Sequence, residues 1–112
     1  MKYYYNLYVD DKVAPQQEKI QKKIENDEWQ LEKYLIVLTD NPRNHLEIFQ
    51  SVLLIQKAIQ KETVFVVGIA SGYEEALELV EKIAREVYDE TKGTDIRNYI
   101  LQKQEKFEEG NV

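Results

Sequence analysis

The spacing of hydrophobic and polar residues changes sharply within residues 63–88, and this segment indicates the class of fold. Val64 to Ala70 is a continuous, mainly apolar run that is rich in β-branched residues. Such a run is typical of a strand that is buried on both faces, as in a parallel sheet covered by helices. From Tyr73 onward the apolar residues recur at helical spacing. The segment therefore predicts a buried strand, a short turn and an amphipathic helix.

The turn between this strand and this helix reads Ser71-Gly72-Tyr73-Glu74, which fits a capping box. In that motif the Ser71 hydroxyl accepts from the Glu74 amide, and the Glu74 carboxylate accepts from the Ser71 amide. A glycine at a helix start also suits a phosphate site. However, the spacing matches neither the dinucleotide fingerprint nor a P-loop. We therefore interpret Ser71 and Gly72 first as a helix cap and second as candidate ligand-binding residues.

Patterns elsewhere in the chain predict two more strands and three more helices. Lys2 to Val9 alternates in the manner of a strand and is rich in tyrosine, while Tyr34 to Leu38 is apolar on both faces. Helical patterns cover residues 13–28, His45 to about Lys61, with Asn44 as a second expected cap, and residues 94–108. We expect residues 109–112 to be a frayed tail.

The element order βαβαβαα predicts one α/β domain over residues 1–112. Alternation of strands and helices implies a three-stranded, mostly parallel sheet flanked by helices. Strand orders 1-2-3 and 2-1-3 both suit the sequence. Such a sheet has two edges, and the predicted helix over residues 46–59 has a wide apolar side. Pairing of one edge or of that side across a two-fold axis would cover it, so we expect a homodimer.

Charge and composition narrow the range of partners. The 112 residues contain no cysteine and carry a formal net charge of −6. Residues 72–90 hold seven carboxylates against Lys82 and Arg85, which argues against nucleic acid and anionic membranes as partners. No segment approaches the ~20 apolar residues of a membrane-spanning helix, and the first residues lack the apolar core of a signal peptide. We therefore expect a cytoplasmic location and no membrane association.

Parallel strands would bring three strand-to-helix loops to one edge of the sheet, where open α/β sheets bind ligands. Candidate ligand-binding residues at that edge are Asp10, Asp11, Arg43, Ser71 and Gly72. Candidate metal ligands, suited to Mg²⁺ by their oxygen atoms, are Asp10, Asp11 and Asp40. The candidate catalytic residue is His45, as a general base oriented by Asp40.

Two functions remain open on these residues. Aspartates in turns are mostly solvated, and a lone histidine without a recognisable nucleophile is slight support for catalysis. We therefore favour a small, non-enzymatic cytoplasmic interaction or assembly module and expect no cofactor. The alternative is a small-ligand or Mg²⁺-binding protein, with or without hydrolytic activity, that uses the loops at the carboxyl edge of the sheet.

Overall fold

A computed structural model describes residues 1–28, 33–55 and 63–110 of the protein. Its strands are β1 (Lys2–Val9), β2 (Tyr34–Leu38), β3 (Leu46–Gln50) and β4 (Phe65–Ala70). Its helices are the 3₁₀ turn η1 (Ala14–Gln16), α1 (Gln17–Glu25), α2 (Val52–Ile55), α3 (Tyr73–Thr91) and α4 (Ile96–Glu108). None of the helices in these ranges is long and apolar enough to cross a membrane.

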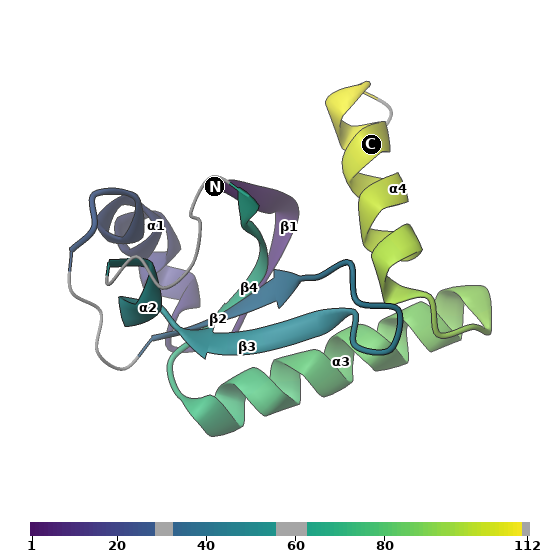
Figure 1. Ribbon diagram of the computed structural model, residues 1–112, viewed down its shortest axis with the longest axis horizontal. Helices are drawn as coiled ribbons and strands as arrows, with labels where there is room; N and C mark the ends of the chain where they lie inside the picture. Colours follow the sequence, from purple (N-terminus) through teal and green to yellow (C-terminus); the bar gives the residue numbers. More distant parts are fainter. Residues whose placement is uncertain (29–32, 56–62, 111–112) are drawn as a thin grey trace.

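The strands form one mixed sheet in the order β1-β4-β2-β3 (Figure 1). β1 is parallel to β4, whereas β2 is antiparallel to both β4 and β3. The predicted three-stranded, mostly parallel sheet is therefore wrong, and so are both predicted strand orders. The chain leaves α1 and enters the sheet beside β4 in the opposite direction, and it then turns back as a β-hairpin instead of continuing as a helix.

That hairpin replaces the first part of the helix predicted from His45. Leu46–Gln50 pairs residue by residue with β2, and the Thr39 amide donates to the His45 carbonyl at 2.8 Å where the strands meet the turn. Asn44, expected to cap a helix, belongs to the hairpin turn instead, and its amide donates to the Asn41 carbonyl. Helical structure begins only at α2, and the rest of the predicted helix falls on residues outside the described ranges.

Helices cover both faces of the sheet, as Figure 1 shows. On one face, Ile20 and Ile24 of α1 pack with Leu35 of β2 in a buried cluster. On the other face, α3 confirms the predicted amphipathic helix, because its buried stripe packs against Ile36 of β2 and Val67 of β4. The residues of that stripe are Ala76, Leu79, Ile83 and Val87. The apolar run from Val64 to Ala70 is buried on both faces as expected, although only one of its neighbouring strands is parallel.

Candidate functional site

Asp10 and Ser71 meet where the parallel strands β1 and β4 end. The Ser71 amide and hydroxyl both donate to Asp10 Oδ2, at 2.6 and 2.9 Å. The amides of Lys12 and Val13 donate to Asp10 Oδ1, at 2.9 and 3.0 Å. Each carboxylate oxygen therefore accepts two hydrogen bonds from the protein, and the group joins the end of β1 to the end of β4.

These hydrogen bonds change the pKa of Asp10. Partial burial is the largest single influence and raises the pKa of this carboxyl, but the bonds from Ser71, Val13 and Lys12 together lower it below its usual value. They also explain why the predicted capping box is wrong. The Ser71 hydroxyl is turned to Asp10, and α3 begins after Gly72 without a side-chain cap.

Asp40, Arg43 and His45 lie at the opposite end of the strands from Asp10 and Ser71. Because β2 is antiparallel to β4, the end of β2 lies beside the start of β4, whereas Ser71 follows the end of β4. The sequence therefore predicted Asp10 and Ser71 correctly as neighbours and Asp40 wrongly. The exposed Asp11 and the half-buried Gly72 flank the Asp10–Ser71 pair in sequence. The three loops form no common site.

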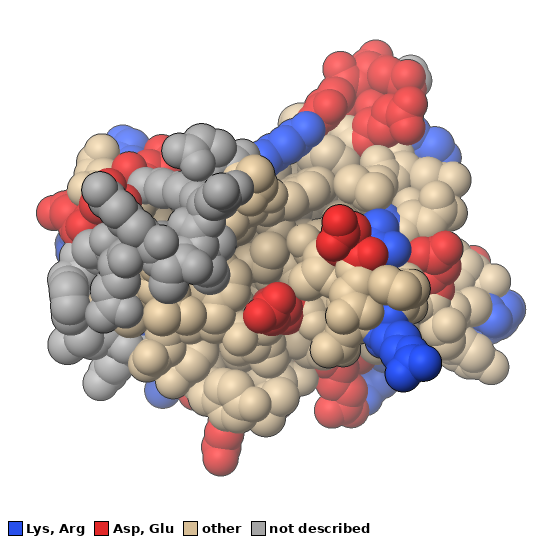
Figure 2. Space-filling view, viewed as in Figure 1, with Lys and Arg blue, Asp and Glu red and all other residues tan. Residues whose placement is uncertain are grey.

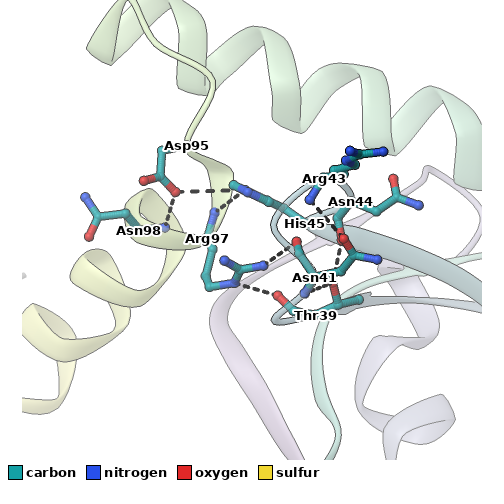
Figure 3. Close-up of polar contacts among 8 residues, drawn as sticks. All are labelled: Thr39, Asn41, Arg43, Asn44, His45, Asp95, Arg97 and Asn98. Atoms are coloured by element: carbon teal, nitrogen blue, oxygen red, sulfur yellow. Dashed lines mark hydrogen bonds and ion pairs between the residues drawn. The ribbon is translucent and has the colours of Figure 1, made fainter.

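His45 is part of a polar contact between the β2–β3 hairpin and the start of α4 (Figure 3). Its Nδ1 accepts a hydrogen bond from the Arg97 amide at 3.2 Å and lies 3.9 Å from a carboxylate oxygen of Asp95. The Asp95 side chain also caps α4 by accepting from the Asn98 amide at 3.1 Å. Since Nδ1 is the acceptor of a main-chain donor on α4, this nitrogen ties the hairpin to the start of that helix.

Arg97 fastens the same hairpin through its guanidinium group. Its Nε donates to the Thr39 carbonyl at 2.6 Å, and a terminal nitrogen donates to the Asn41 carbonyl at 2.7 Å (Figure 3). Beside this contact is an open depression of about 490 Å³ whose lining includes Leu46, Val80 and Asp95. Arg97 therefore fixes the turn that positions β3. No pattern in the sequence indicates this role for Arg97, because its hydrogen-bond acceptors are main-chain carbonyls 58 and 56 positions away.

The β1 edge of the sheet is covered by α4 at Tyr5. The buried Gln104 side chain accepts from the Tyr5 amide at 2.8 Å, and the Tyr5 and Phe107 rings stack with centroids 4.6 Å apart. At the start of the same strand, Lys2 forms an ion pair of 2.6 Å with Glu108 of α4. A side-chain acceptor therefore takes the place that a neighbouring strand would occupy at Tyr5.

The β3 edge has no such cover within the described residues. The Thr39–His45 and Lys33–Ser51 main-chain bonds show that odd-numbered residues of this segment direct their amides and carbonyls toward β2. Antiparallel strands alternate in this respect, so Leu46 and Ile48 direct theirs away from the sheet. Among the described residues, neither residue has a hydrogen-bond partner on that outer side. Within the described ranges, β3 is therefore an open edge strand.

A partly exposed apolar surface, here called the β3 shelf, adjoins this edge. It comprises Leu46 and Ile48 of β3 together with Tyr73, Leu77 and Val80 of α3. Tyr73 contacts the ring of Tyr34 on β2, and Val80 borders the same depression as Leu46, so this flank of α3 faces the β3 side. Tyr73 and Leu77 are 54% and 47% exposed. Figure 2 shows that the surface over β3 and the adjoining part of α3 is mostly uncharged.

A comparison of the chain with protein-family models, with curated proteins and with solved structures finds no match. Within the part of the chain that the structure describes, no group of three or more Asp, Glu or His side chains is arranged to hold a metal ion. Three features of the structure remain for interpretation. Asp10 joins the ends of β1 and β4, Arg97 holds the β2–β3 hairpin, and β3 has unpaired outward main-chain groups among the described residues.

Proposed function

We propose that the protein is a small, non-enzymatic interaction module that binds through its open β3 edge and the β3 shelf, and that its partner is a second copy of the chain. The observation that carries this proposal is that α4 covers the β1 edge at Tyr5, whereas among the described residues nothing bonds the outward main-chain groups of Leu46 and Ile48 on β3. An edge with free main-chain donors and acceptors is a template for pairing with another strand. A cytoplasmic location without nucleic acid as a partner belongs to the same proposal.

The β3 shelf supports this use of the edge. Exposed apolar residues that stand alone are ordinary, whereas a group of them beside an unpaired strand gives a binding surface both hydrogen bonds and apolar area. Tyr73 and Leu77 belong to a helix whose remaining exposed positions are mostly charged. The net charge of −6 opposes self-association at long range, so the apolar contact must carry the pairing and salt should strengthen it.

The alternative of a ligand or Mg²⁺ site has less support from the geometry. The Asp10 carboxylate already accepts hydrogen bonds from three residues of its own chain. Asp40 lies at the opposite end of the strands and cannot complete a site with Asp10. A ligand at Asp10 would have to displace hydrogen bonds that hold β1 to β4, at a cost of about 1.5–3 kcal/mol for each bond to a charged group.

Light scattering across a range of protein concentrations tests the proposal. The protein should move from monomer to dimer as its concentration rises, and Leu77→Glu should weaken the dimer at least about tenfold, because it places a charge in the apolar contact. Leu101→Glu is a matched control, since Leu101 is a similarly exposed leucine (43%) on α4 outside the β3 shelf. A protein that stays monomeric at millimolar concentration, or that responds equally to both substitutions, would contradict the proposal.

A further inference from the structure

We infer that two copies of the chain pair antiparallel through β3 in a single register centred on Ile48, which joins their sheets into one continuous sheet of eight strands. This inference rests on the function proposed above and specifies its geometry. A two-fold axis perpendicular to the sheet would pass beside Ile48, so that each Ile48 faces its counterpart. Such an isologous pairing closes on itself and leaves no further open β3 edge.

The direction of the main-chain groups limits the possible registers. In an antiparallel pair, two residues that exchange both main-chain hydrogen bonds must both direct their amides and carbonyls toward the partner. Ile48 satisfies this condition, because the bonds to β2 are made by the odd-numbered residues on either side of it. A centre at Ile48 therefore gives two main-chain hydrogen bonds on the axis itself.

Several antiparallel registers place the same side chains on the same face of the sheet, and they differ in the residue that lies opposite Glu47. Glu47 is the only charged residue of the strand. A register centred on Glu47 would place two carboxylates directly opposite each other, an arrangement that is destabilising. With Ile48 at the centre, Glu47 lies opposite Phe49 of the partner subunit instead. A centre at Leu46 would pair Ile48 with Asn44, whose amide is already bonded to Asn41 within the hairpin turn.

The β3 shelf agrees with the same arrangement. Leu46, Ile48 and the exposed flank of α3 lie on one side of the sheet. The two-fold axis perpendicular to the sheet places both shelves on that side, next to each other beneath the paired strands. Apolar side chains from both copies would then face a shared space, which gives the dimer an apolar contact beyond the strand pairing.

A cysteine scan reads the register directly, because the native chain contains no cysteine. Single variants Leu46→Cys, Glu47→Cys, Ile48→Cys and Phe49→Cys are oxidised by air with a copper–phenanthroline catalyst. Directly opposed residues that exchange hydrogen bonds have Cα atoms about 5.5 Å apart, within the range that a disulfide spans. Diagonal neighbours lie about 8 Å apart and do not bridge. Ile48→Cys should therefore be the one single variant that forms a covalent dimer.

A mixed experiment avoids dependence on a substitution at Ile48, whose side chain packs against the core. Glu47→Cys and Phe49→Cys proteins, each unable to cross-link alone, should form a disulfide-linked heterodimer when they are mixed. Cross-linking of Glu47→Cys or Leu46→Cys alone would overturn the register while leaving a β3 dimer in place. A dimer by light scattering with no cross-link at any position would overturn pairing through β3. A monomer without cross-links would contradict the proposed function itself.

Discussion

The two edge strands of the sheet, β1 and β3, differ in the hydrogen bonding of their outward main-chain groups. At β1, the side chain of Gln104 bonds the outward amide of Tyr5, and the Phe107 ring stacks on the Tyr5 ring. At β3, the outward groups of Leu46 and Ile48 have no bonded partner among the described residues. An edge strand invites pairing with other chains unless something covers it. The α4 helix therefore protects β1 at Tyr5, whereas the outward groups of Leu46 and Ile48 are available for binding within the described part of the chain.

Side-chain hydrogen bonds also tie β1 to the rest of the molecule. Asp10 joins β1 to β4, and the Tyr8 hydroxyl donates to Glu86 of α3 at 2.7 Å. The β2–β3 hairpin depends instead on Arg97, which reaches it from the start of α4. We therefore expect substitutions in the β1 half to change folding stability most. Substitutions around β3 should change association more than folding.

Asp10→Ala should have the largest effect on folding, because it removes a carboxylate that accepts four hydrogen bonds. We expect the free energy of unfolding to fall by about 3 kcal/mol, since bonds to a charged group contribute about 1.5–3 kcal/mol and are partly replaced by water. Urea denaturation monitored by circular dichroism measures the change. Asp11→Ala, at the exposed neighbouring residue, is the control and should change stability little. Equal losses for both variants would show that Asp10 does not anchor β1.

The contribution of Asp10 should depend on pH in a defined direction. The pKa of this carboxyl is lower in the folded protein than its usual value of about 4. Its ionised form therefore stabilises the fold above about pH 4, and this stabilisation is lost as the pH falls through the folded pKa. The difference in stability between the native protein and Asp10→Asn should be full at pH 7 and shrink progressively below pH 4. A difference that grows on acidification would contradict this sign.

Gln104→Ala should remove the cover of the β1 edge and make the two edges more alike. It leaves the Tyr5 amide without its acceptor, so we expect a loss of about 1–2 kcal/mol in the free energy of unfolding. The Tyr5 amide should also exchange its hydrogen faster. Gln102→Ala, at an exposed position of the same helix, should change neither quantity. Unchanged exchange at Tyr5 in the Gln104 variant would show that this side chain does not close the edge.

Arg97→Lys should have the smallest effect on folding and a clearer effect on association. Lysine keeps the charge but cannot reach both the Thr39 and Asn41 carbonyls with the planar geometry of arginine. We expect a loss of about 1 kcal/mol in unfolding free energy and a weaker dimer, because the hairpin that carries β3 is less firmly held. Arg85→Lys, at an exposed arginine paired with Glu81, provides the control. Association that is equally strong in both variants would separate Arg97 from the β3 surface.

Local patterns in the sequence predict some parts of this fold well. The helical spacing from Tyr73 onward predicts α3, and the short, β-branched apolar run before it favours the strand that the structure has as β4. The neighbourhood of Asp10 and Ser71 follows because β1 and β4 are indeed parallel. These successes depend on information that lies within short segments or in one parallel pair.

The helix predicted from His45 is wrong over the hairpin because the sequence there suits two kinds of element. Leu46, Phe49 and Val52 have helical spacing, while Leu46 and Ile48 alternate with Glu47 as in a strand. Pairing with β2 decides for the strand, and that pairing is a tertiary interaction. The direction of β2 likewise depends on the path after α1. Because β2 runs antiparallel to β4, Asp40 and His45 lie at the opposite end of the strands from Asp10. The strand β3 stands where a helix was predicted.

Amide hydrogen exchange measured at several protein concentrations tests the role of the open edge most directly. Glu47 and Phe49 direct their amides to β2 and Tyr5 is bonded by Gln104, so their protection should not depend on dimer formation. The amides of Leu46 and Ile48 should exchange rapidly in dilute protein and become protected as its concentration rises. Rapid exchange of Leu46 and Ile48 at every concentration, up to the highest that remains in solution, would contradict pairing through β3.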